Sequence, residues 1–114
     1  MVKSSVVFLS LLALAFLSPW AGVAHAEDAA VKIGKFTFDP PELQVKAGTL
    51  VTWTNEDDIP HTVAAADRSF KSKPLDTDEK YTFAFTAPGS YTYFCSLHPQ
   101  MKATIIVEGA ASKK

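Results

Sequence analysis

Three side chains that can each bind a metal lie within seven residues near the C-terminus, and they constrain this chain more than any other feature. Cys95, His98 and Met101 follow one another at three-residue intervals and offer a thiolate, an imidazole and a thioether. Cys95 is the single cysteine of the 114 residues, so no disulfide can form within the molecule. Thiolate and thioether ligands favour copper(I), whereas imidazole binds copper in either oxidation state. The run therefore predicts a metal site.

Residues 1–26 have the pattern of a secretory signal peptide. Lys3 supplies a positive charge, and the apolar run over residues 6–17 is too short to span a bilayer comfortably. Residues 24–26, Ala-His-Ala, match the small-residue pattern that signal peptidase cuts after. An uncleaved membrane anchor is the alternative interpretation. We expect export to the periplasm and cleavage at that point, which leaves residues 27–114 as a single domain without a membrane span.

Charge and size limit the partners that this chain can have. It carries 11 Lys and Arg against 12 Asp and Glu, and loss of Lys3 with the signal peptide changes this to 10 against 12. The resulting net charge of −2 provides no basic surface for nucleic acid. We therefore expect a monomer that binds no nucleic acid and whose partners are proteins.

The fourth ligand must come from another part of the sequence. After removal of the signal peptide, His61 and His98 are the histidines that remain. His61 follows a polar loop and begins an apolar stretch, so a neighbouring strand can bring it beside Cys95. Two histidines, one cysteine and a weak axial methionine are the ligands of blue-copper electron-transfer sites. We expect one copper ion per chain, cycling between Cu(II) and Cu(I), with the ligands His61, Cys95, His98 and Met101.

Other sites and functions compete with this interpretation. Zinc accepts cysteine and histidine, but methionine is a poor zinc ligand. A Cys-His nucleophile pair is a second alternative, although the chain is short for a papain-like protease. A periplasmic copper carrier or storage protein needs exchangeable sites richer in methionine or histidine, and a copper enzyme needs an open coordination position or a second metal. A metal-free β-sandwich leaves the run around Cys95 unexplained, so we expect an electron carrier and no enzyme.

The mature region consists of short β-rich segments separated by turn residues, with no helical period. The expected strands cover residues 31–38, 42–46, 49–54, 61–65, 81–86, 91–95 and 103–107. Apolar positions change phase between Ile33 and Phe36, which predicts a β-bulge in the first strand. Residues 96–102 are expected to form a loop. The pattern predicts an all-β fold that closes as a sandwich or a barrel.

Four segments resemble the cupredoxins, and most closely their amicyanin and plastocyanin-like branch. They are residues 47–55 (Ala-Gly-Thr-Leu-Val-Thr-Trp-Thr-Asn), 59–63 (Ile-Pro-His-Thr-Val), 85–91 (Phe-Thr-Ala-Pro-Gly-Ser-Tyr) and the run from Cys95 to Met101. The short Cys-x-x-His-x-x-Met spacing is the amicyanin-like feature. The resemblance implies an eight-stranded Greek-key β-sandwich. It also implies soluble one-electron transfer between periplasmic redox partners.

The same resemblance implies where a partner binds. The ring edge of His98 should reach the surface inside an apolar rim formed by Leu97 and Pro99 with Pro60. We expect a redox protein of the dehydrogenase or cytochrome type to dock there transiently.

Two residues depart from the family's pattern. Thr62 stands directly after His61, where many cupredoxins have asparagine. Its backbone N–H can still donate to the sulfur of Cys95, and the sequence leaves open whether its side chain makes the bridge that asparagine usually supplies. Gln100 stands where amicyanins carry a large apolar residue, and it makes the expected docking rim more polar.

Overall fold

The computed structural model describes residues 27–109, which contain strands, turns and loops. The expected signal peptide lies outside these residues. Within the described part of the chain, no helix is long and apolar enough to cross a membrane.

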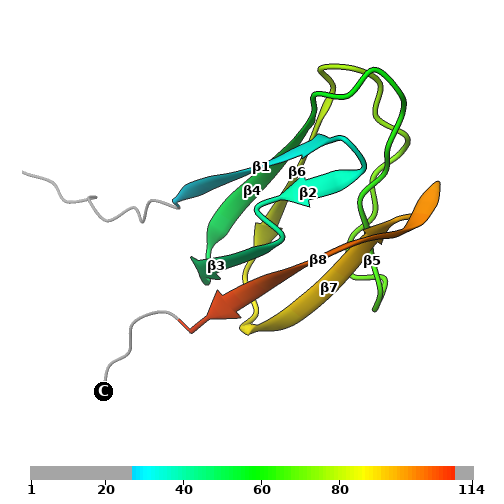
Figure 1. The fold of residues 1–114 in the computed structure, drawn as a ribbon. Helices are drawn as coiled ribbons and strands as arrows, with labels where there is room; N and C mark the ends of the chain where they lie inside the picture. The colour runs from blue at the N-terminus through cyan, green and yellow to red at the C-terminus, as the bar shows by residue number, and fades with distance from the viewer. Residues whose placement is uncertain (1–26, 110–114) are drawn as a thin grey trace, which may run out of the picture.

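The strands form two four-stranded sheets that pack face to face (Figure 1). The first sheet has the order β2-β1-β4-β6, with β1 at Asp28–Gly34, β2 at Thr37–Asp39, β4 at Thr49–Asn55 and β6 at Lys80–Phe85. The second has the order β3-β8-β7-β5, with β3 at Glu42–Lys46, β5 at Ala64–Ala65, β7 at Gly89–Cys95 and β8 at His98–Glu108. The chain passes repeatedly from one sheet to the other, as in Greek-key sandwiches. The prediction of an all-β, eight-stranded sandwich is confirmed for the described residues.

Each of the two sheets is mixed, because it contains one parallel pair of strands among antiparallel pairs. β1 pairs in parallel with β4, and β3 pairs in parallel with β8. The remaining pairs are antiparallel, including the β7–β8 hairpin. Because register fixes which side chains face inward, strands such as β1 and β4 present alternate residues to the core.

The core between the sheets is rich in aromatic rings. Trp53 of β4, Phe85 of β6 and Tyr93 of β7 are its largest fully buried side chains. Phe70 and Leu75 join them from the long segment between β5 and β6, where the sequence predicted no strand. The rings meet in edge-on and tilted contacts, which pack aromatic groups favourably. This core forms a rigid base beneath the end of the sandwich that carries the metal-binding residues.

The predicted bulge in the first strand is wrong, because the chain reverses direction there. Gly34 pairs with Thr37, so a two-residue turn of Lys35 and Phe36 joins β1 to β2. Both turn residues lie in the left-handed region, with φ of 53° and 61°. Such turns normally carry asparagine or glycine, and the sequence Lys-Phe gives no such signal. In the sequence, β1 and β2 therefore resembled a single strand over residues 31–38 in which the apolar positions change phase.

Candidate metal centre

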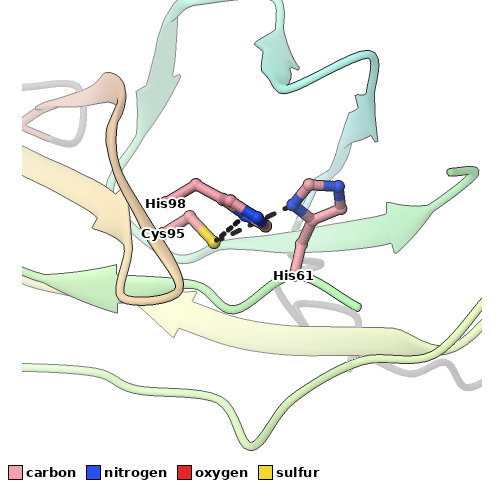
Figure 2. Close-up of side chains that lie close together, drawn as sticks. All are labelled: His61, Cys95 and His98. Atoms are coloured by element: carbon pink, nitrogen blue, oxygen red, sulfur yellow. Dashed lines mark hydrogen bonds between the residues drawn. The ribbon is translucent and has the colours of Figure 1, made fainter. Parts of the chain in front are cut away.

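Three of the four expected ligands come together at one end of the sandwich. One ligand atom from each of His61, Cys95 and His98 lies within 4.8 Å of the others. The Sγ of Cys95 is 3.8 Å from Nδ1 of His61 and 3.6 Å from Nδ1 of His98. Figure 2 shows both imidazoles turned toward the sulfur. The same nitrogen of each ring is therefore directed at one point.

The β7–β8 hairpin explains why Cys95 and His98 are close. The two residues are register partners across the hairpin, with a register shift between Phe94 and Cys95. Because β8 begins at His98, the connection is only Ser96 and Leu97, and the predicted loop over residues 96–102 is wrong. The bulge and the tight turn bring the thiol and the imidazole to the same side, which the sequence spacing alone could not show.

His61 reaches the site from the segment between β4 and β5. It forms an isolated bridge with Leu75, in which each residue's N–H donates to the other's C=O at 3.2 and 2.8 Å. The expected strand over residues 61–65 is therefore wrong for its first half, since β5 contains only Ala64 and Ala65. The His61 side chain is completely buried, so its ring is held by packing on all sides.

Asn55 fixes the loop that precedes His61. Its side-chain amide donates to the carbonyls of Ile59 and Leu75, each at 2.9 Å, and its side-chain oxygen accepts the N–H of Asp57 at 2.9 Å. Asn55 itself is fully buried, and three hydrogen bonds satisfy its amide. This network sets the path of the chain into His61.

Asp57 lies in the polar loop before His61, and no role was predicted for it from the sequence. Its Oδ2 accepts a 2.8 Å hydrogen bond from Nε2–H of His61. Because Nε2–H is directed at Asp57, Nδ1 is the nitrogen that faces the sulfur of Cys95, and once it carries no proton its lone pair can bind a metal. The His61 hydrogen bond is the main reason that the pKa of the Asp57 carboxyl lies below its ordinary value. Metal-binding histidines generally donate their second ring N–H to a carboxylate or a carbonyl, and this rule could have pointed to an acidic residue near His61.

Cys95 is buried but lies among hydrogen-bond donors. Burial raises the pKa of its thiol, but the backbone N–H of Thr62, at 3.4 Å from Sγ, lowers it more than any other single group. His61, His98 and the N–H of Leu97 lower it further, and together these contacts bring the pKa to about 6. The thiolate is the form of cysteine that binds metals, so the site is arranged for a metal ligand.

Thr62 also supplies the side-chain bridge that its difference from asparagine had left in doubt. Its Oγ1 accepts the N–H of Ser96 at 2.7 Å, and the two hydroxyl oxygens are 2.7 Å apart. The same hydroxyl lies 3.8 Å from the sulfur of Cys95. The segment that carries His61 is therefore tied to the turn that follows Cys95.

Met101, the fourth expected ligand, lies in β8. Its side chain is buried and belongs to the core cluster that also contains Cys95. The rim residues predicted for docking are on the surface: Leu97 is 49% exposed, and Pro60 and Pro99 are also exposed. His98, which lies between Leu97 and Pro99 in the sequence, is partly exposed.

Comparison with known proteins places the chain in a family. The model of the cupredoxin-like domain matches residues 7–107. The chain belongs to the cupredoxin family. It is 39% identical over 90 residues to amicyanin-alpha of Methylorubrum extorquens, which covers 75% of this chain and 76% of the relative. It is 35% identical over 97 residues to amicyanin of Paracoccus denitrificans, covering 80% of this cupredoxin and 74% of that protein.

Solved structures agree with this relationship. A purple cupredoxin from Nitrosopumilus maritimus superposes with a TM-score of 0.68 at 31% identity, covering 70% of this chain and 99% of the other. A reduced amicyanin variant gives a TM-score of 0.67 at 31% identity, with coverage of 77% and 87%. The predicted resemblance to the amicyanin branch is confirmed.

The donor set fits the metal of this family. Cupredoxins bind one copper ion, and related amicyanin variants have been solved in a Cu(I) form. Two imidazole nitrogens, a buried thiolate and a thioether are a copper-binding combination. The amicyanin and plastocyanin relatives are electron-transfer proteins and not enzymes, and they indicate that this chain is a small copper electron carrier.

Proposed function

We propose that this protein is a soluble periplasmic one-electron carrier whose single copper ion is bound by His61, Cys95, His98 and Met101. The observation that supports this most strongly is the convergence of two Nδ1 atoms on one buried sulfur, within 4.8 Å. When bound, copper supplies the change between Cu(II) and Cu(I) that carries one electron.

The protein's own residues keep the ligands in place during that change. Asp57 fixes the ring orientation of His61, and the Thr62–Ser96 bridge ties together the segments carrying His61 and Cys95. Met101 is buried in β8 between His98 and Lys102, which both pair with β7. Because each ligand is held by the fold itself, little atomic movement accompanies electron transfer.

The partly exposed edge of His98 is the proposed route for the electron. The surrounding rim of Leu97, Pro99 and Pro60 provides an apolar surface for a redox protein of the dehydrogenase or cytochrome type. Gln100 is exposed beside it and adds a polar group to the rim. A small apolar contact of this kind suits a transient complex.

We also propose that residues 1–26 are removed on export and that residues 27–114 act as a monomeric domain. The small-residue pattern at residues 24–26 supports cleavage there. β1 begins at Asp28, so the proposed cut leaves every described strand intact.

Voltammetry of the copper-loaded protein, followed by transfer of Cu(I) to a chelator, tests this function against the copper carrier. An electron carrier gives a reversible one-electron wave and releases its copper slowly, because His61, Cys95 and Met101 are buried. Rapid and complete copper transfer with no reversible wave would instead establish a carrier or storage role.

A further inference from the structure

Phe36 places an aromatic ring against the metal-binding residues from the opposite sheet. Its ring centroid lies 4.9 Å from that of His98, with the planes at 89°, and 5.7 Å from that of His61, at 88°. The two imidazoles are themselves 5.1 Å apart. Both Phe36 contacts have the edge-to-face geometry that aromatic rings prefer. The three rings form a cluster, although they come from three separate segments.

Hydrophobic burial does not explain this position. Phe36 is 49% exposed, so much of its ring remains in contact with water. Its backbone and that of Lys35 adopt the left-handed conformation, which is unfavourable for residues with large side chains. Such conformations persist where the surroundings over-determine them and are concentrated at functional sites. Within the structure, the two histidines are the aromatic neighbours of Phe36.

His98 differs from His61 in what holds its ring. The Nε2 of His61 is bound to Asp57, and the ring is completely buried. His98 is partly exposed, and within residues 27–109 its Nε2 has no hydrogen-bond partner. Metal-binding histidines normally have an outer contact that fixes the orientation of the ring. For His98 this contact must be something other than a hydrogen bond to Nε2 from the described residues. The ring of Phe36 is in position to provide it.

Phe36 also borders the site on the side of the methionine. It lines a surface pocket together with Phe38, Gln100 and Met101. A small molecule that approaches the metal ligands through this pocket meets the Phe36 ring.

We propose that Phe36 is a positioning residue for His98 that also closes the metal centre to small ligands from solvent. This inference rests on the proposed copper site. The ring restricts rotation of the His98 imidazole through its edge-to-face contact. It covers the centre from the β1–β2 turn, which lies at the same end of the molecule as the β7–β8 hairpin (Figure 1).

Azide binding to the Cu(II) proteins tests the proposal, followed in visible and EPR spectra. We compare the wild type with Phe36→Ala, Phe36→Leu and Phe36→Tyr. Phe36→Ala and Phe36→Leu should bind azide about tenfold more tightly than the wild type, which is the scale of one aromatic contact. Phe36→Tyr keeps the ring and should restore the wild-type value. Leu50→Ala is the matched control, because Leu50 is also exposed but lies at the start of β4.

Several results would overturn this role. Equal azide affinity in the wild type and Phe36→Ala would show that the ring does not close the centre. If Phe36→Leu matched the wild type, an apolar side chain of similar size would suffice and positioning by the ring would be wrong. Should Phe36→Ala fail to fold, the comparison of Phe36→Leu with Phe36→Tyr decides the question.

The spectra of the wild type separate this inference from the proposed function. If the wild type lacks an intense thiolate-to-copper band, the copper site itself is wrong. If that band is present in all variants while azide affinity does not change, the copper site stands and the role of Phe36 is refuted.

Discussion

Single hydrogen bonds around the ligands determine how this site is held. Asp57 orients His61, and Thr62 joins the segments that carry His61 and Cys95. The meeting of His61, Cys95 and His98 could be predicted because cysteine and histidine are rare in residues 27–114 and their chemistry is specific. Their supporting residues could not, because an aspartate or a threonine has a role only when the fold sets its direction.

Asp57→Ala should weaken copper binding by about 10- to 100-fold, the usual effect of removing an outer partner of a metal-binding histidine. The reason is that Nε2 of His61 loses its acceptor and the ring loses its fixed orientation. Competition for Cu(I) against a chelator measures the change. Asp58→Ala is the control, since Asp58 is an exposed neighbour. Equal affinity in Asp57→Ala and the wild type would contradict the role of Asp57.

Thr62→Val should lower the free energy of unfolding of the apoprotein by about 1–3 kcal/mol. Valine keeps the shape and the backbone N–H to sulfur, but it leaves the N–H of Ser96 without its acceptor. Urea unfolding measures the loss, and Thr62→Ser, which retains the hydroxyl, should recover most of it. A Thr62→Val protein as stable as the wild type would mean that the bridge contributes nothing.

The elements differ in how well the sequence predicts them. Alternation of Tyr81, Phe83 and Phe85 identified β6, because one of its faces is more buried than the other. The β1–β2 turn was missed, since Lys35 and Phe36 adopt a backbone conformation that their side chains disfavour. The start of β8 was missed for a different reason. Residues 98–101 lie at the tip of the β7–β8 hairpin, where apolar and polar residues do not alternate as they do in a strand with one buried face.

Lys35→Asn should stabilise the β1–β2 turn by about 1 kcal/mol, because asparagine tolerates the left-handed region better than lysine. Urea unfolding should show a higher midpoint with an unchanged slope. Lys46→Asn makes the same substitution in β3, where asparagine is unfavourable, and should give no gain. A destabilised Lys35→Asn protein would show that the turn carries no strain that asparagine relieves.

At the scale of the whole molecule, two sheets around an aromatic core support a metal centre at one end. Trp53, Phe85 and Tyr93 are fully buried among protein side chains. We therefore expect this fold to form without a metal, unlike small domains in which the metal replaces a core. The family and the sandwich could be predicted from sequence because strand patterning and the ligand spacing agree.

The apoprotein should therefore be folded, and copper should add to its stability. A ligand that binds only the folded state stabilises it by about 4 kcal/mol at a thousand times its dissociation constant. Unfolding curves of the apoprotein and the Cu(I) protein, followed by circular dichroism, measure this difference. An apoprotein with no β-sheet signal, which gains structure only when copper is added, would contradict a preformed site.

The proposed electron transfer depends on copper binding to the sulfur of Cys95, between His61 and His98. The visible and EPR spectra of the Cu(II)-loaded mature protein, measured beside those of Cys95→Ser, test this bond. We predict an intense thiolate-to-copper band and a narrow copper hyperfine splitting, with both lost in Cys95→Ser. A pale protein with ordinary copper splitting, unchanged by Cys95→Ser, would show that Cys95 is not a ligand and would contradict the electron-transfer function.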